Sequence, residues 1–368
     1  MLAGCPLCDE GYGYPDGANG ERWEAADALF HQDPRWLGAD GASSIDLGGD
    51  RTLWLFGDSF IATSAALTRR EATMVRNSVA VMSGRDPLTA TMEFAWRDAA
   101  TPGSFFPEAG DHWFWPSHGV RVPDGPLLLF LAEERPTPGQ GLGFAAAGYR
   151  VVRVADPDQP PSTWTLETVA TLPAPQDVDA SVGACMVVDG DQLVAVSVDG
   201  DSTHDGRLVR WPLAEIAAGD ASAPEWWSDG AWVAQPALVK NPTIVFDDAG
   251  SECSLSGDGW GGWTYVASRG FGASTIAVRS APRLTDGWKL TAADAFTPPE
   301  SAGDAPFVYA GKAHPELRSD GDHSAYSWDL VVTYADNSFT FADLLDPARE
   351  KTLYWPHFAR IAFWYPAC

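Results

Sequence analysis

The chain carries little positive charge. It has 24 Lys and Arg residues against 50 Asp and Glu residues, which gives a net charge of −26 over 368 residues. A surface of this sign repels the phosphates of nucleic acids and the head groups of anionic membranes. We therefore expect no nucleic-acid partner, and we interpret most of the carboxylates as a solvated shell rather than a patch for a cationic partner.

Long apolar runs are also missing, so no segment is predicted to span a bilayer. The first residues nevertheless contain Leu2-Ala3-Gly4-Cys5, a pattern that precedes the lipid-modified Cys of bacterial lipoproteins. The apolar signal region that should come before this pattern is absent. The pattern predicts a lipid anchor at Cys5 and a secreted protein or a periplasmic or outer-membrane lipoprotein. An accidental match is the alternative.

Cysteine is scarce, with five residues in all. Without Cys5, the four others (Cys8, Cys185, Cys253 and Cys368) allow two disulfides in three pairings. We expect a Cys8–Cys368 disulfide that joins the two ends of the chain, while Cys185 and Cys253 leave other pairings open. Cys5-x-x-Cys8 has neither a second CxxC nor a His pair after it, as a zinc site would need. Asp199 and Asp201 leave a calcium site possible, but no loop has the full ligand spacing, so we predict no metal and no cofactor.

Tryptophan, by contrast, is abundant, with 17 residues. Many of them are expected in the core. The faces of Trp rings also stack on the apolar faces of sugars, so this abundance favours a carbohydrate ligand.

Short strand patterns separated by turn signals repeat along the chain, and helical patterns are few. Sequences such as Pro123-Asp124-Gly125 and Asp189-Gly190-Asp191 mark tight turns. The predicted strands form five groups: 42–47, 52–57, 77–82 and 92–97; 113–122, 127–132, 149–154 and 163–169; 181–188, 192–198, 206–211 and 226–233; 237–246, 262–268, 274–280 and 287–292; 310–317, 327–334 and 353–363. This pattern predicts an all-β chain of five antiparallel units, with short helices near 213–218 and 341–351.

Four-stranded antiparallel units repeated along a chain are typical of a β-propeller, in which each blade covers the faces of its neighbours. We predict a five-bladed β-propeller with a single central funnel, in preference to a β-sandwich of two large sheets. The last group is one strand short, and an N-terminal segment is expected to complete it and close the ring. The predicted division is an N-terminal arm over residues 1–37, irregular over 11–20, and a propeller domain over residues 38–368.

The stretch from Gly38 to Ile61 predicts a hairpin that carries two aspartates. Asp40 enters the first strand and Asp58 leaves the second, with a Gly-Gly-Asp turn at 48–50 between them. Because antiparallel pairing brings the start of one strand beside the end of the next, we expect both carboxylates at the same end of the hairpin. Either Asp could instead be a turn or capping residue.

Ligands of propellers bind at the face where inner strands begin and second strands end. The predicted strands bring further polar and aromatic residues to this face: Asn77, Trp115, His118, Glu133, Arg269, Lys312, His314 and Glu316. Such residues converging from several blades are typical of a binding pocket. Simpler interpretations are a hydrogen-bonded core histidine for His118 and an ion-paired surface residue for Glu133. Lys312, His314 and Glu316 alternate along one side of a predicted strand whose other side is apolar.

Five stretches resemble a known family: GADGASSIDL (38–47), TLWLFGDSF (52–60), RNS (76–78), YAGKAHPEL (309–317) and YWPHFARI (354–361). They resemble a family of five-bladed propellers long labelled as of unknown function, some of whose members are endo-D-arabinofuranosidases that cut mycobacterial arabinan. The wider group includes arabinanases, xylosidases and fructosidases. The resemblance covers the first and last blades by motif and the middle blades by strand pattern. It implies that Asp40 acts as base or nucleophile and that Asp58 is a second active-site carboxylate. The acid is not fixed by a motif, and Glu133 and Glu316 are the candidates.

The chemistry is consistent with this resemblance. Cleavage of a glycosidic bond needs one protonated carboxyl group and one ionised carboxylate, and crowded carboxylates in a funnel raise one pKa. We therefore expect a monomeric glycoside hydrolase acting on a furanose-containing polysaccharide, in the manner of an endo-D-arabinanase. The residues expected to hold the substrate are Asn77, Trp115, His118, Arg269, Lys312 and His314. The alternatives are a non-catalytic carbohydrate-binding propeller and a polysaccharide lyase that uses His118 or His314 as its base.

Overall fold

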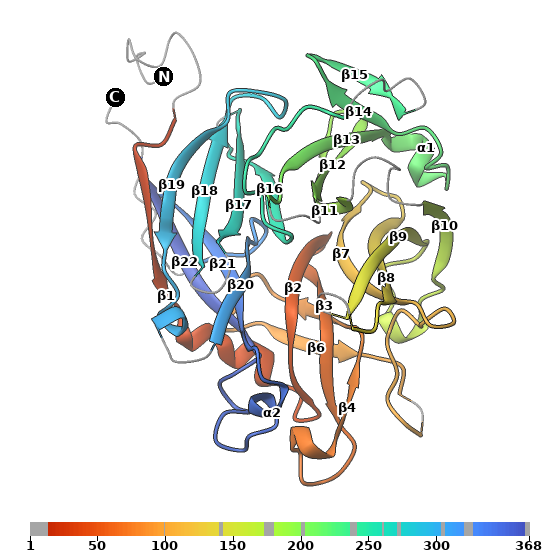
Figure 1. Cartoon of the computed structure of the whole chain (residues 1–368), viewed down its shortest axis with the longest axis vertical. Helices are drawn as coiled ribbons and strands as arrows, with labels where there is room; N and C mark the ends of the chain where they lie inside the picture. Colours follow the sequence, from red (N-terminus) through yellow and green to blue (C-terminus); the bar gives the residue numbers. More distant parts are fainter. Residues whose placement is uncertain are drawn as a thin grey trace.

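The computed structural model is a ring of five antiparallel sheets around a central axis (Figure 1), which confirms the predicted five-bladed propeller. It describes residues 14–98, 100–139, 143–172, 180–199, 203–235, 241–259, 261–270, 274–302, 306–319 and 327–364. The first strand of each blade lies closest to the axis and later strands lie progressively further out. Within these residues no helix is long and apolar enough to cross a membrane.

The blades follow one another along the chain. Blade I contains β2 (Trp36–Gly48), β3 (Arg51–Ala62), β5 (Ser78–Ser83) and β6 (Thr91–Ala95), with β4 (Ala72–Val75) paired to β3. Blade II contains β7 (Trp113–Arg121), β8 (Leu127–Pro136), β9 (Phe144–Val154) and β10 (Glu167–Leu172). Blade III contains β11 (Ala180–Asp189), β12 (Gln192–Asp199), β13 (Gly206–Pro212), β14 (Glu225–Ser228) and β15 (Ala231–Ala234).

Blade IV contains β16 (Cys253–Gly257), β17 (Trp263–Arg269), β18 (Thr275–Ala281) and β19 (Lys289–Phe296). Blade V contains β20 (Pro306–Ala313), β21 (Ser327–Ser338), β22 (Pro356–Trp364) and β1 (Gly17–Arg22). The described helices are short: η1 (Glu24–His31), η2 (Arg69–Glu71), η3 (Pro161–Thr163), α1 (Leu213–Ala217), η5 (Pro299–Ala302) and α2 (Phe341–Leu344).

Apolar side chains fill the spaces between neighbouring blades. Leu55 of blade I and Leu129 of blade II belong to one buried cluster, and equivalent clusters join the other adjacent pairs. Trp54 of blade I and Phe358 of blade V share a cluster with Phe30 of η1, so this helix packs across the junction of the first and last blades. Successive side chains of a strand point to opposite faces of its blade, so continuous apolar runs such as those of β3 and β8 supply apolar residues to both faces.

Strand β1 closes the ring by pairing antiparallel with β22 from Gly17↔Trp364 to Arg22↔Ala359. It supplies the strand that the last predicted group lacked, and it shows that the irregular arm predicted over 11–20 is wrong at residues 17–20. Blade IV also differs from prediction. Its inner strand is β16 rather than 237–246, and residues 241–245 carry no strand, while 236–240 lie outside the described residues.

The cysteine predictions fall largely outside the described residues, because Cys5, Cys8 and Cys368 are not among them. Cys185 in β11 and Cys253 in β16 are free and buried. Their thiols lie within hydrogen-bonding reach of each other across the junction of blades III and IV.

Candidate active site

Asp40 and Asp58 lie opposite one another on the β2–β3 hairpin, which confirms their expected placement. Ala39 pairs with Ser59 and Gly41 with Phe56, and the register shifts between these two pairs. Such an irregularity re-aims side chains at the end of a strand pair. The glycine of the FGDSF motif has a steric role here, because a Cβ on Gly57 would stand 2.3 Å from Oδ1 of Asp40.

The Asp40 carboxyl is half-buried and held by tyrosines of blade V. The Tyr309 hydroxyl donates to Oδ2 of Asp40 at 2.7 Å, and the Tyr354 hydroxyl also faces this carboxyl. Burial, together with the negative charges of Asp58 and Glu252, raises the pKa of Asp40 to about 7 against the opposing hydrogen bonds of the tyrosines. Near neutral pH Asp40 can therefore hold or release a proton.

Asp58 contacts two donors. Nε1 of Trp115 donates to Oδ1 at 3.0 Å, and Arg76 donates to Oδ2 at 3.3 Å. Burial raises the pKa of Asp58, while Trp115 and Arg76 act in the opposite direction. Burial outweighs these donors, so the pKa of Asp58 is raised overall, but Asp58 is the member of the pair that has a cation and an N–H donor to support its ionised form.

Aromatic rings continue outward from both carboxylates. Beyond Asp58, the Trp115 ring meets the Phe144 ring edge-on with centroids 4.8 Å apart. Beyond Asp40, the Tyr309 ring neighbours Phe307 at 5.1 Å, and Phe307 neighbours the 71% exposed Phe339 at 4.6 Å. Aromatic faces of this kind are suited to stacking on sugar rings.

A third carboxylate, Glu252, was missed by the sequence analysis. It immediately precedes β16, and its charge contributes to the raised pKa of Asp40. The Nζ atom of Lys312 lies 3.3 Å from Oε1 of Glu252 and also donates to the backbone oxygens of Gly41 and Ala310. This ammonium group thus joins the inner strands of blades I and V to the start of blade IV.

The predictions that Lys312 and His314 hold the substrate need correction. Lys312 is 1% exposed and directs its donors at Glu252 and two carbonyls, so it is not available to hold a sugar. His314 is fully buried, with Nδ1 bonded to Ser44 at 2.6 Å and Nε2 bonded to Thr333 at 2.7 Å. Burial is also the main cause of a His314 pKa well below its usual value, so this ring is a neutral core histidine.

Asn77 also lies away from the opening. It is fully buried, and its amide donates to the carbonyls of Phe106 and Phe114 and accepts from the backbone of Phe106. All of its hydrogen-bonding groups hold protein backbone, so Asn77 braces the start of β7 instead of binding a ligand.

The structure does not bring the two predicted acids to Asp40. Glu316 lies beside Ser44 and within the influence of Asp46 and Arg85, toward the turn end of the β2–β3 hairpin. Ser44 is four residues along β2 from Asp40, roughly 13 Å at the usual strand rise. Glu133 forms ion pairs within blade II, at 2.7 Å from Nδ1 of His112 and 3.6 Å from Arg150.

His118 and Arg269 have different surroundings. Among the described residues Nδ1 of His118 has no hydrogen-bond partner, and burial lowers the pKa of this histidine to about 4. A base with so low a pKa is weak at neutral pH, which disfavours the lyase alternative. Arg269 ends β17 at the same end of blade IV as Glu252 and donates to Asp248 at 3.0 Å.

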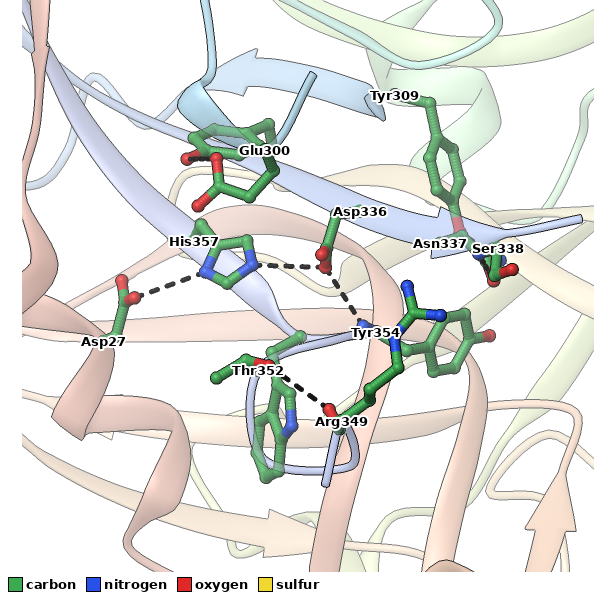
Figure 2. Close-up of polar contacts among 12 residues, drawn as sticks. Asp27, Glu300, Tyr309, Asp336, Asn337, Ser338, Arg349, Thr352, Tyr354 and His357 are labelled. Carbon is green, nitrogen blue, oxygen red and sulfur yellow. Dashed lines mark hydrogen bonds and ion pairs between the residues drawn. The ribbon is translucent and has the colours of Figure 1, made fainter. Parts of the chain in front are cut away.

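A second polar cluster lies next to this site. Figure 2 shows His357 between Asp27 and Asp336, with Tyr354 hydrogen-bonded to Asp336. Three of these residues, Asp27, Asp336 and His357, line a cleft of about 480 Å³ together with Arg22. No group of three or more His, Cys, Asp or Glu side chains in the described parts of the chain is arranged to hold a metal ion.

Solved structures share this fold at low sequence identity. A proposed hydrolase from Bacteroides ovatus ATCC 8483 matches with a TM-score of 0.71 and 15% identity, over 94% of this chain and 90% of that one. The catalytic domain of a Coprinopsis cinerea GH62 alpha-L-arabinofuranosidase matches at 0.51 and 11% identity, over 96% and 100%. Zg3597, a family 117 glycoside hydrolase from the marine bacterium Zobellia galactanivorans, matches at 0.50 and 12% identity, over 95% and 92%.

The propeller is therefore a fold that glycoside hydrolases also use. No curated protein matches the chain. A family model matches residues 24–364, nearly the whole sequence. The chain belongs to that family, DUF5005, which is described as a domain of unknown function.

Proposed function

We propose that the protein is a glycoside hydrolase that cuts a furanose-containing polysaccharide, with D-arabinan as the first substrate to test and with cleavage inside the chain. The observation that carries this proposal is the Asp40–Asp58 pair on adjacent strands, in which Asp40 has a pKa of about 7. Glycoside hydrolysis uses two carboxyl groups whose environments separate their protonation states.

In this proposal Asp40 is the acid. Its carboxyl group donates a proton to the glycosidic oxygen as the bond between that oxygen and the anomeric carbon breaks. This role replaces the base or nucleophile expected from sequence, because burial and two neighbouring negative charges favour the protonated form of Asp40.

Asp58 is the ionised partner, supported by Trp115 and Arg76. It either bonds to the anomeric carbon, to be displaced later by water, or takes a proton from the attacking water. The configuration of the first product, read by NMR, distinguishes these routes: retention indicates the covalent step and inversion the direct attack. Glu252, fixed by Lys312, keeps Asp40 prone to protonation.

Three further features support a polysaccharide substrate. Aromatic rings continue from both Asp40 and Asp58, so sugar units on each side of the cleaved bond can be stacked. Two of the similar folds belong to a GH62 alpha-L-arabinofuranosidase and a family 117 glycoside hydrolase. Trp115 and Arg269 remain proposed substrate contacts. We also propose that the protein acts as a monomer outside the cytoplasm, where such polymers occur, with Cys5 as the proposed anchor point.

The test is incubation of the purified protein with D-arabinan, linear L-arabinan, fructan and xylan, followed by sizing of the products. We expect oligosaccharides of intermediate length from D-arabinan, and none when Asp40→Asn or Asp58→Asn replaces the native protein. Release of single sugars only would contradict cleavage inside the chain. Retention of a glycan on an affinity gel without any cleavage would replace the hydrolase with a carbohydrate-binding propeller.

A further inference from the structure

We propose that Arg69 and Asp336 are positioning residues that clamp the backbone of Tyr354, so that its hydroxyl stays directed at the Asp40–Asp58 pair. The clamp serves the site of the proposed function, but it can be tested without any substrate.

Tyr354 has an unusual conformation for its residue type. It lies between α2 and β22 with φ of +65°, in the left-handed region that bulky side chains rarely adopt. Its hydroxyl lies 3.0 Å from the backbone oxygen of Asp58 and within hydrogen-bonding reach of the Asp40 carboxyl, so its single proton can be donated to either acceptor and to Asp40 when that carboxyl is ionised. Such a conformation is strained and persists only where surrounding contacts impose it.

Asp336 holds the nitrogen side of Tyr354. Its Oδ1 atom accepts from the Tyr354 backbone nitrogen at 3.0 Å and from Nε2 of His357 at 3.2 Å (Figure 2). The other ring nitrogen of His357 lies 2.8 Å from Arg22 and 3.3 Å from Asp27. Because Asp336 is itself almost completely buried in β21, this acceptor has a fixed position.

Arg69 binds the backbone carbonyl oxygen of Tyr354. Arg69 is 2% exposed, and its guanidinium donates to the carbonyls of Tyr354 at 3.3 Å, Leu37 at 2.8 Å and Leu344 at 3.3 Å. These carbonyls come from three separate segments, which Arg69 therefore joins at one point. Few side chains present so many donors in a fixed plane.

Gly38, two residues before Asp40, leaves room for the contact between Arg69 and Tyr354. Gly38 has φ of +110°, and a Cβ at this position would stand 2.4 Å from the Tyr354 carbonyl oxygen and 2.6 Å from Arg69. A larger residue would displace both. The approach of β2 to Asp40 and the position of Tyr354 are thus coupled through the same glycine.

The clamp has a measurable consequence at Asp40. The groups that face its carboxyl are Asp58 of β3, Glu252 before β16, Tyr309 of β20 and Tyr354. The two negative charges favour the protonated carboxyl, while the two hydroxyls favour its anion. Loss or displacement of the Tyr354 hydroxyl must then raise the pKa of Asp40.

The experiment is a carboxyl-carbon NMR titration of the whole protein, with the Asp40 signal assigned by its loss in Asp40→Asn. Tyr354→Phe removes the hydroxyl and should raise the Asp40 pKa by about half a unit to one unit. Asp336→Ala should raise it in the same direction, and Asp336→Asn, which keeps an oxygen acceptor for the Tyr354 nitrogen, should restore most of the native value.

The double variant Tyr354→Phe/Asp336→Ala separates positioning from general damage. If Asp336 acts through Tyr354, the double variant titrates as Tyr354→Phe does. Additive shifts, or an unchanged Asp40 pKa in either single variant, would overturn the proposal. Should Asp336→Ala fail to fold, Arg69→Lys provides the second measurement: it keeps the charge but cannot reach three carbonyls, and an unshifted Asp40 pKa in that variant overturns the clamp equally. Loss of hydrolase activity alone does not bear on these titrations.

Discussion

Asp27 and Asp40 are two half-buried carboxylates whose charged neighbours differ in sign. Asp40 lies beside Tyr354 and negative neighbours, whereas Asp27 lies beside His357, three residues further along the chain, and positive neighbours. Asp40 faces Asp58 and Glu252, which add to burial in raising its pKa to about 7. Asp27 faces His357 and Arg22, whose hydrogen bonds outweigh burial and lower its pKa. Burial acts in the same direction on both groups, so the sign of the surrounding charge decides their protonation.

The comparison separates a reactive carboxyl from a structural one. The Asp27 cluster lines a sizeable cleft, yet its charges are balanced, and it joins η1 to β1 and β22 of blade V. Around Asp40, Arg76 pairs with Asp58 and Lys312 pairs with Glu252, whereas Asp40 itself is bonded to a tyrosine hydroxyl, so burial and the two neighbouring carboxylates still raise its pKa. A carboxyl with a pKa raised in this way is typical of a proton-transfer site. The volume of a cleft is here a poorer guide to chemistry than the groups that face each carboxyl.

The largest expected effect is the loss of turnover in Asp40→Asn. Asn keeps the size and polarity of the side chain but cannot donate the acidic proton, so turnover on the glycan identified by the panel should fall by about 10²- to 10⁴-fold. Asp46→Asn on the same strand is the matched control, since its carboxylate is 54% exposed and pairs with Arg85. Comparable losses in both variants would withdraw the assignment of Asp40.

The second prediction concerns pH. If Asp40 is the acid, turnover should fall about tenfold per pH unit above its pKa near 7. A rate that rises through this range would make Asp40 the base.

A raised folded-state pKa also means that ionisation of Asp40 costs stability, so this cost appears as pH rises from about 4 to 7. Asp40→Asn should therefore melt at or above the native temperature at pH 8, as measured by calorimetry.

A smaller effect is expected from Trp115→Phe. The change removes the Nε1 donor to Asp58 but keeps an aromatic ring beside Phe144. A hydrogen bond to a charged group contributes about 1.5–3 kcal/mol, so turnover should fall by roughly tenfold or more. Trp113→Phe is the control, because Asp58 does not receive its donor, and it should lose less than about threefold. Equal losses would show that ring size, not the hydrogen bond to Asp58, matters.

The arrangement within blade I could be predicted because its contacts are local in sequence. Asp40 and Asp58 are on consecutive strands joined by a tight turn, so antiparallel pairing alone places them together. The glycines at 38 and 57 were visible in the same motifs, although only the structure shows that each prevents a clash with a neighbouring side chain or carbonyl.

Glu252 was missed because the inner strand of blade IV was assigned to the wrong stretch. The apolar sequence at 237–246 was more strand-like than Cys-Ser-Leu-Ser-Gly of β16, in which small polar residues predominate. Close packing of five inner strands around one axis favours such small residues, and this tertiary effect overrides local propensity.

Blade V shows a second limit. Regular alternation predicted that Lys312 and His314 face the funnel, but the β20–β21 register shifts between Tyr309 and Lys312, and Ala310 has φ of +61°. The shift brings Tyr309 to Asp40 and turns Lys312 toward Glu252. Tyr354 reaches the same carboxylates only because ring closure places the last blade beside the first.

The smallest effect on turnover is expected for Asp27→Asn, which alters the balanced member of the comparison. The variant should keep turnover within about threefold of native, because Asp27 contacts His357 and Arg22 rather than Asp40. It should instead lose about 1–3 kcal/mol of unfolding free energy at pH 7, less than for a fully buried pair because both partners are partly exposed.

Asp27 has a lowered folded-state pKa, so its contribution is present above the unfolded value near 3.9 and is lost as pH falls. Asp27 and Asp336 outweigh burial and raise the pKa of His357 to about 9, so the histidine contributes stability below about 6.5 that is lost as pH rises through 9. Removal of the Asp27 charge should bring that alkaline loss to lower pH. Chemical denaturation between pH 4 and 10 measures the loss of stability on both the acid and the alkaline side. An Asp27→Asn variant with native stability but much reduced turnover would reverse the roles of Asp27 and Asp40.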